Sequence, residues 1–198
     1  MDTASFKVRT FKPCEVVYSP FTKAKEVFVI TKGYVMALTY DDEGRRHIHL
    51  IYGPGAYFPV ITAFKDKPQR ATYEALSEVE VELYKKDTFL QLIDQDLPFC
   101  RRILLKTVDQ VGIFADRVVE LQTAKLEDRL LARLKVLIKD HGVTGANGSH
   151  LPYKLSHQHL ADLLGVERES ITRAFNRLQK KGIVARNRED IVFIYDPS

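Results

Sequence analysis

Residues 155–184, LSHQHLADLLGVERESITRAFNRLQKKGIV, decide the fold of the C-terminal part of this chain. Ser156 is a favourable first cap for a helix, because its hydroxyl can accept a hydrogen bond from an unpaired N–H of the first turn. Gly165 then interrupts the apolar pattern, and glycine adopts the left-handed backbone conformation of a tight turn at little steric cost. The stretch therefore predicts two helices joined by a turn, with the second running from about residue 168 to 181.

Three small or apolar residues fix how these two helices meet. Ala161, Gly165 and Ile171 are spaced four and then six residues apart. A small residue thus lies where the helices touch, a glycine takes the turn, and a branched apolar residue holds the second helix down. This spacing is typical of a helix-turn-helix, whose second helix enters the major groove of DNA.

The second helix has one apolar and one polar face. The apolar positions are Ile171, Ala174, Phe175 and Leu178, and the opposite positions are Arg168, Glu169, Thr172, Arg173 and Asn176. Arginine can bond guanine, glutamate the cytosine amino group, and asparagine adenine. Residues 168–188 contain seven basic residues and one acid, so their net charge of +6 exceeds the +4 of the whole chain. The positive charge is concentrated on the element predicted to contact DNA.

The stretch after this helix predicts a wing. Residues 186–190 look like a hairpin tip that leads into a strand over 191–195. Such a wing would hold Arg186 and Arg188 near phosphates. The alternative is a solvated basic helix in a scaffold that binds no DNA; the spacing, the two faces and the wing together favour DNA binding.

The N-terminal part predicts a β-barrel or sandwich. Short apolar or alternating runs are separated by Gly and Pro, at residues 26–30, 34–40, 47–52 and 78–83. Gly44 suits the positive φ of a hairpin turn after an acidic run. We expect this β domain to span residues 1–96.

A long helix is predicted over residues 97–122, starting near Asp96 and Pro98. Its apolar positions alternate in steps of four and three, at Leu104, Val108, Val111, Ala115 and Val118. This heptad spacing favours a two-helix seam and hence a homodimer. The alternative is one amphipathic helix packed on its own β domain. We expect the C-terminal domain to begin at residue 123, with a further helix over 125–141 and a polar loop over 144–149.

Composition excludes several other classes. The chain has 198 residues, 45% of them hydrophobic and 28% charged, which is typical of a folded domain. Its two cysteines, Cys14 and Cys100, cannot form a disulfide framework or supply a four-thiolate iron–sulfur cluster. Neither a signal peptide nor a run of ~20 apolar residues is present, so we expect a cytoplasmic protein without a membrane partner.

An enzyme is not expected. The chain has no P-loop, no glycine-rich dinucleotide turn and no metal-ligand spacing. Ser156 and His157 are adjacent, but neighbours on a helix do not face each other.

The chain closely resembles the Crp/Fnr family of bacterial transcription regulators over nearly its full length. The resemblance is carried by residues 26–55 (EVFVITKGYVMALTYDDEGRRHIHLIYGPG), the long helix and the winged helix, in the family's order. It implies an α+β protein with a jelly-roll-like effector domain (a β-roll similar to cyclic-nucleotide-binding domains), dimerisation through the long helix, and binding to double-stranded DNA. RNA polymerase is a further partner that the resemblance implies.

The start of the second helix is similar to the Arg-Glu-x-x-x-Arg pattern of Crp-like members. Arg168, Glu169 and Arg173 match it, which implies half-sites similar to TGTGA, with the arginines on guanines and the glutamate on a cytosine. Glu167 departs from the family, which commonly has a serine cap there. The residues predicted to contact phosphates are Ser156, His157, Gln158, Ser170, Thr172, Arg177, Lys180, Arg186 and Arg188.

The β domain departs from the family at the nucleotide site. Cyclic-nucleotide-binding members have a Phe-Gly-Glu-Leu-like turn, whereas residues 58–61 read Phe-Pro-Val-Ile and lack the carboxylate. Gln69 stands at the family's arginine position, and Arg70 lies one place later, where a strand or turn would direct it to the other side. We therefore expect that cyclic AMP is not bound in the family's manner.

The effector of this domain stays open. A pocket for another small molecule would include Tyr57, Phe58, Arg70 and Thr72. Haem is an alternative, with His47, His49 and Cys14 as ligands, although lone histidines on a strand more often have no metal. No other metal site is predicted.

Overall fold

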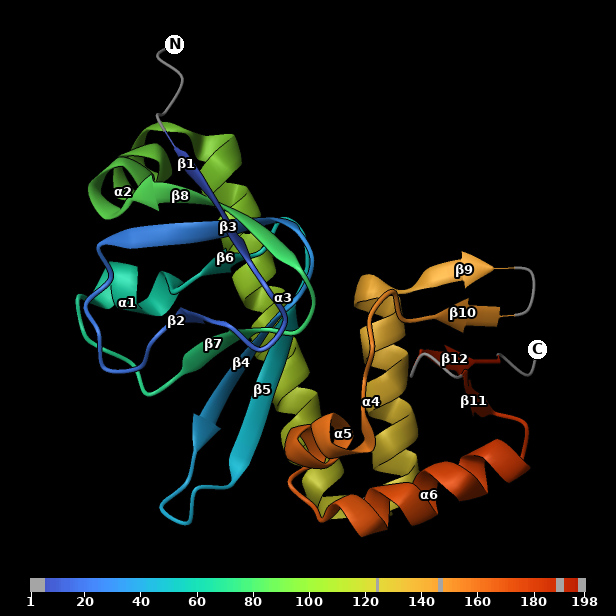
Figure 1. The fold of residues 1–198 in the computed structure, drawn as a ribbon. Helices are drawn as coiled ribbons and strands as arrows, with labels where there is room; N and C mark the ends of the chain where they lie inside the picture. Colours follow the sequence, from blue (N-terminus) through green and yellow to red (C-terminus); the bar gives the residue numbers. More distant parts are fainter. Residues whose placement is uncertain (1–5, 124, 146–147, 188–190, 196–198) are drawn as a thin grey trace. The chain divides into compact units, whose positions relative to one another are not determined.

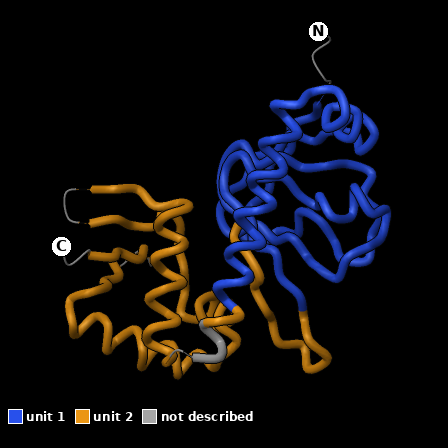
Figure 2. Tube along the Cα trace, turned by 180° about the vertical axis from the view of Figure 1, so that it is seen from behind, with its two compact units in different colours: residues 1–39, 52–117 blue, residues 40–51, 118–198 orange. Residues whose placement is uncertain are grey.

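The computed structural model describes residues 6–123, 125–145, 148–187 and 191–195. The chain divides into two compact units, one of residues 1–39 and 52–117 and the other of residues 40–51 and 118–198 (Figure 2). The predicted domain limits differ from this division at two places. Residues 40–51, within the β domain by sequence, belong to the second unit, and so does the end of the long helix.

The strands of the first unit belong to two four-stranded sheets, one of which also includes residues 46–51 of the second unit (Figure 1). One sheet has the order β1-β8-β3-β6, and the other has the order β2-β7-β4-β5. The strands are β1 (Lys7–Phe11), β2 (Val16–Tyr18), β3 (Glu26–Lys32), β4 (Val35–Tyr40), β5 (Arg46–Tyr52), β6 (Tyr57–Phe58), β7 (Thr72–Ala75) and β8 (Val79–Lys85). The predicted β domain is therefore confirmed, and two of its strands continue into a hairpin of the second unit.

Alternation along β8 shows why this sequence forms a sheet. Val79, Val81 and Leu83 are buried, while the glutamates between them are half-buried. Successive side chains of a strand point to opposite faces, so one face of β8 joins the core. The strand lies antiparallel between β1 and β3.

Aromatic side chains from both sheets fill the space between them. The Phe58 ring stacks between those of Tyr73, with centroids 4.5 Å apart, and Phe28, with centroids 5.2 Å apart. Tyr18 and Tyr52 pack around this stack at centroid distances of 5.9–6.2 Å. We call these five residues the aromatic cluster; Phe58 is fully buried within it.

Three helices complete the first unit: α1 (Val60–Lys65), α2 (Lys86–Gln95) and α3 (Leu97–Thr123), the last of which continues into the second unit. The α3 helix begins where the sequence predicts, and the Asp96 carboxylate accepts a hydrogen bond of 2.9 Å from the Phe99 N–H. Ile103 of α3 is buried in a cluster with Val27 and Phe89. Part of α3 therefore packs on its own β domain.

The predicted seam of α3 is exposed within this single chain. Leu104, Val108, Val111 and Val118 are each 56–62% exposed, and Ala115 is exposed as well. An apolar stripe of this kind on one face of a helix is a common mark of a protein interface. Within the described residues, no helix is both long and apolar enough to cross a bilayer.

The second unit contains the winged helix-turn-helix. Its helices are α4 (Leu126–His141), α5 (His157–Leu164) and α6 (Arg168–Lys180), and its strands are β9 (Val143–Gly145), β10 (Gly148–His150), β11 (Val184–Arg186) and β12 (Val192–Ile194). The strands form one sheet in the order β11-β12-β10-β9 (Figure 1). Leu130, Leu134, Leu160 and Phe175 are among the residues buried between the helices.

The prediction of a polar loop over residues 144–149 is corrected by the structure. Thr144 and Gly145 of β9 pair with Ser149 and Gly148 of β10 inside this stretch, and residues 146–147 lie outside the described part. Gly148 makes this possible, because its φ is +104° and a Cβ there would lie 2.7 Å from the Ile194 carbonyl oxygen. Strands of three residues with little apolar alternation leave no periodic pattern in the sequence.

Candidate nucleic-acid interface

The first helix of the motif begins with reciprocal hydrogen bonds. Ser156 Oγ accepts from the His159 N–H at 3.1 Å, and the Ser156 N–H donates to His159 Nδ1 at 3.4 Å. Burial lowers the pKa of His159, which keeps its ring neutral and able to accept. The predicted cap is confirmed, and this arrangement leaves the start of α5 satisfied without a glutamate at the third position.

The turn between α5 and α6 has the predicted glycine conformation. Gly165 has φ 65° and ψ 44°, and its N–H donates to the Ala161 carbonyl. Glu167 precedes α6, and its side chain makes no capping hydrogen bond. Its charge still favours the positive end of the helix dipole.

The two faces of α6 are separated as predicted. Ile171, Ala174, Phe175 and Leu178 are each no more than 3% exposed. Arg168, Glu169, Arg173 and Asn176 are exposed on the other side, and Thr172 is half-buried. The side chains predicted to contact bases are thus outside the core of this unit.

Hydrogen bonds connect several of the predicted contact residues. Arg173 Nη2 donates to Ser170 Oγ at 3.1 Å, which orients the guanidinium one turn along the helix. Thr172 Oγ1 donates to the Arg168 carbonyl at 3.0 Å and lies 3.0 Å from Nδ1 of His157. The structure therefore brings His157 of α5 against Thr172 of α6.

Arg177 has a partner that the sequence did not predict. Its Nε forms an ion pair with Glu127 of α4, and Lys181 Nζ lies 3.3 Å from the other oxygen of the same carboxylate. The hydrogen bond from Arg177 is the main reason that the pKa of Glu127 is lowered. A phosphate contact by Arg177 must therefore compete with Glu127, whereas Lys180 is exposed.

Arg186 of the wing also has an internal contact. Its guanidinium carbon lies 4.9 Å from the centre of the Phe175 ring, and its Nε and Nη2 atoms are buried. A cation over an aromatic face is attracted by the ring. Two of the three guanidinium nitrogens of Arg186 are therefore turned inward, and Arg188 lies outside the described residues.

Two of the residues predicted to form an effector pocket, Tyr57 and Phe58, direct their rings into different aromatic groups. Tyr57 packs against Phe89 and Phe99, at centroid distances of 5.9 and 5.8 Å, whereas Phe58 points into the aromatic cluster. Thr72 is buried, and Arg70 is exposed. Neighbouring strand residues point to opposite faces, which separates the two aromatic rings.

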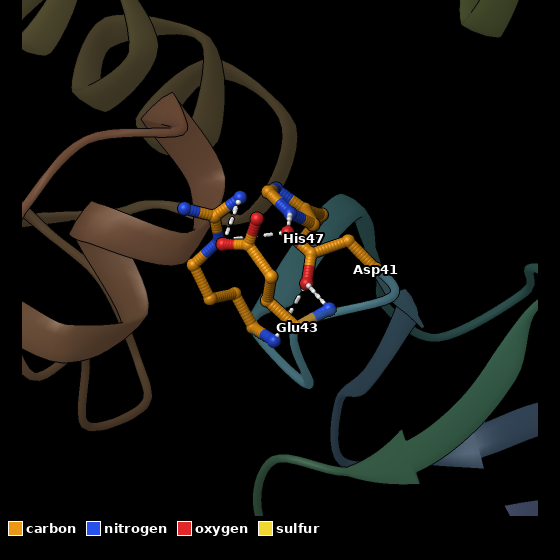
Figure 3. A network of polar contacts seen from close by, with 4 residues as sticks. Asp41, Glu43 and His47 are labelled. Carbon is orange, nitrogen blue, oxygen red and sulfur yellow. Dashed lines mark hydrogen bonds and ion pairs between the residues drawn. The ribbon is translucent and has the colours of Figure 1, made fainter.

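The residues considered for haem are likewise distributed over different sites. Figure 3 shows His47 against the Asp41 carboxylate in the hairpin between β4 and β5. Its Nε2 lies 3.0 Å from Oδ2 of that carboxylate. Cys14 is exposed. Across the described ranges, no group of three His, Cys, Asp or Glu side chains could hold a metal ion.

The aromatic cluster is the feature of the β domain that the sequence did not predict. Burial raises the pKa of Tyr52 to about 12 and raises that of Tyr73 still further. Both phenols therefore stay neutral at physiological pH. Aromatic residues in separate short strands were the available indication, but their mutual stacking depends on how the two sheets face each other.

Comparison with known families covers most of the chain. Residues 8–96 match the cyclic nucleotide-binding domain, and residues 128–198 match the Crp-like helix-turn-helix domain. This chain belongs to the Crp/Fnr family. It is accordingly a DNA-binding transcription regulator with an N-terminal β-roll and a C-terminal winged helix-turn-helix.

Relatives of this Crp/Fnr protein align along nearly its whole length. A global nitrogen regulator of Nostoc sp. is 24% identical over 197 residues, covering 96% of this chain and 87% of the relative. The cAMP-activated global transcriptional regulator CRP of Escherichia coli is 24% identical over 174 residues, covering 86% and 81%.

Solved structures show the same fold. FixK2 from Bradyrhizobium japonicum aligns with a TM-score of 0.82 at 20% identity, over 97% of this chain and 93% of that one. The c-di-GMP responsive regulator CLP from Xanthomonas campestris aligns with a TM-score of 0.76 at 21% identity, over 96% and 94%.

Proposed function

We propose that this Crp/Fnr protein binds an inverted-repeat DNA site as a homodimer, with α6 in the major groove. The observation that carries the proposal is the separation of α6 into a buried apolar face and an exposed face with Arg168, Glu169 and Arg173. These side chains can bond guanine and cytosine edges, which supports half-sites similar to TGTGA.

The phosphate contacts proposed for the same surface lie at the start of α5 and along α6. Ser156, His157 and Gln158 occupy the beginning of α5, the positive end of the helix dipole, which attracts anions. Lys180 extends the positive charge at the other end of α6. Phosphate contacts of this kind fix position and orientation without reading sequence.

The homodimer is supported by the exposed seam of α3. Five apolar residues at heptad spacing have no cover in a single chain, and a second copy of the same helix would bury them. Two recognition helices related by a two-fold axis require half-sites about 34–36 Å apart, which is one turn of DNA.

The β-roll is proposed to act without cyclic AMP. Phe58 and Tyr73 are stacked in its interior, and Arg70, the nearest arginine to the family's phosphate-binding position, is exposed. Calorimetric titration of the intact protein with cyclic AMP should show no binding at micromolar concentration. Micromolar or tighter binding that is lost in Arg70→Ala would contradict this part of the proposal.

Further parts of the proposal concern the cellular role. We expect a non-enzymatic, cytoplasmic regulator with RNA polymerase as a protein partner. This expectation follows from the function of a transcription regulator and from the absence of nucleotide-binding or catalytic sequence motifs.

The main test compares one base-contacting residue with one phosphate-contacting residue in a gel-shift assay. Arg173→Ala should cost about 1–3 kcal/mol on the specific site and relax the preference at one base position. Lys180→Ala should weaken binding to all duplexes and flatten the dependence on salt. Equal losses on specific and unrelated DNA for both variants would contradict the assigned roles.

A second test addresses the dimer. Inserting about five base pairs between the half-sites turns one of them by half a helical turn, so tight binding should be lost. A site that tolerates the insertion would exclude a rigid two-fold arrangement.

A further inference from the structure

The hairpin between β4 and β5 is a part of the β-roll sequence that belongs to the second compact unit. Its turn is held by its own residues (Figure 3): the Asp41 carboxylate accepts from the N–H groups of Glu43 and Arg45 at 3.0 and 2.9 Å. Arg45 Nε and His47 Nε2 lie 2.8 and 3.0 Å from the same carboxylate. His47 and Arg45 together lower the pKa of Asp41.

Arg46 of this hairpin contacts the DNA-binding motif. Arg46 Nε lies 3.3 Å from Oδ2 of Asp162, which is on α5 and only 7% exposed. The two atoms lack hydrogen-bond geometry, so the attraction between them is mainly that of opposite charges. A carboxylate this buried is costly without a compensating cation. Arg46 supplies that cation from a distant segment of the chain.

The other carboxylate oxygen of Asp162 accepts a hydrogen bond from Gln158, a residue of the proposed DNA interface. Gln158 Nε2 donates to Asp162 Oδ1 at 2.7 Å, one turn along α5. Gln158 is exposed on the first turn of the helix, and its amide nitrogen carries a second N–H. Asp162 therefore fixes the rotation of the amide group that is proposed to contact a phosphate.

We propose that Arg46 is a positioning residue for DNA binding, acting through Asp162 on Gln158. Arg46 compensates the charge of Asp162, which would otherwise oppose phosphates at the start of α5, and it keeps the carboxylate placed to orient Gln158. The β4–β5 hairpin is thereby a part of the DNA-binding apparatus. This inference rests on the proposed function, because it requires that α5 approaches a phosphate.

Arg45 offers a matched control for the experiment. Arg45→Ala and Arg46→Ala remove the same charge from adjacent residues, but the ion pairs of Arg45 are with Asp41 and Glu43 of the hairpin, and Glu167 attracts it more weakly. In fluorescence-anisotropy titrations with a TGTGA inverted repeat, Arg46→Ala should weaken binding about five- to tenfold, because it removes a side chain coupled to the contact through Asp162. Arg45→Ala should change it less than about twofold, as expected for an exposed pair.

Double variants test whether the effect passes through Asp162 and Gln158. If it does, Arg46→Ala should have almost no further effect on DNA affinity in an Asp162→Asn background. In a Gln158→Ala background its effect should be smaller but not lost, because the charge of Asp162 remains. Equal losses for the two arginine variants, or losses that add in the double variants, would overturn the inference. A salt dependence that becomes shallower by roughly one phosphate contact in Arg46→Ala would also overturn it, because Arg46 would then touch DNA itself.

Urea unfolding without DNA separates this inference from the proposed function. Coupling between Arg46→Ala and Asp162→Asn in unfolding but not in DNA affinity would mean a purely structural pair and would overturn the inference alone. The proposed function fails instead if the unaltered protein and Arg173→Ala bind all duplexes equally. Coupling in both measurements, together with specific binding by the unaltered protein, is the expected result.

Discussion

Two regions of this protein use their characteristic side chains in opposite ways. On α6, the side chains that can bond bases are outside, over an apolar face that is no more than 3% exposed. In the β-roll, Phe58, Tyr73 and Phe28 are inside and stack on one another between the sheets. The DNA-binding motif keeps its functional groups accessible, whereas the β-roll uses its aromatic residues for packing.

The difference reflects the different physical requirements of base recognition and of a ligand site. Base recognition needs a few polar side chains on one exposed face of one helix, and α6 has such a face with Arg168, Glu169 and Arg173. A ligand site in a β-roll needs space among several strands, and protein interiors are packed closely enough that one large ring removes such space.

The largest effect is expected in the β-roll interior. Phe58→Ala should lower the free energy of unfolding by about 3–5 kcal/mol, because it removes a fully buried ring and leaves a cavity. Chemical denaturation measures this change, and Phe64→Ala on α1, where the ring is 50% exposed, is the control with a much smaller loss. Similar losses for the two variants would mean that the β-roll interior is not packed around Phe58.

Acid should destabilise the winged helix through His141, whereas the buried phenols of the β-roll stay neutral at every acidic pH. Burial lowers the pKa of His141 to about 4, and its Nδ1 lies 3.0 Å from the Tyr153 hydroxyl. Between pH ~6.5 and ~4 the unfolded chain therefore binds a proton that the folded chain does not. As the pH is lowered through this range, the free energy of unfolding should fall by about 3 kcal/mol at most.

The variant His141→Gln tests this pH dependence. Without the imidazole, the fall in stability between pH ~6.5 and ~4 should become shallower in urea titrations at a series of pH values. Parallel curves for the variant and the unaltered protein would show that another group causes the acid sensitivity.

A smaller effect is expected at the start of α5. Ser156→Ala removes the side-chain cap and should cost about 1 kcal/mol of stability, with weaker DNA binding as well. Ser156→Thr retains an oxygen that can accept the same hydrogen bond and should restore most of both losses. A loss in the threonine variant as large as in the alanine variant would argue against a capping role.

The smallest effect concerns the positive charge available on α6. Glu127→Gln should release Arg177 and Lys181 and make DNA binding tighter and more dependent on salt, by roughly one phosphate contact. Asp128→Asn, which changes the net charge equally at the next residue, should change the salt dependence less. Weaker DNA binding in Glu127→Gln would mean that the ion pair positions Arg177 for contact with DNA and does not compete with that contact.

Local patterns account for the features that the sequence predicted. The Ser156 cap, the left-handed Gly165 and the two faces of α6 each depend on residues within one or two turns of each other. The alternation of β8 is equally local. Side-chain periodicity and backbone preference act over this range, so the order of the residues alone is enough to derive these features.

Contacts between distant residues were decided only by the folded chain. Arg177 meets Glu127 across fifty residues, Arg46 of the hairpin meets Asp162 of α5, and Phe58 stacks against Tyr73 of the facing sheet. Each of these contacts depends on the relative placement of two elements, which no local period encodes. The amino-acid pattern therefore specifies which side chains can contact DNA, and tertiary packing specifies which of them are already held by another residue.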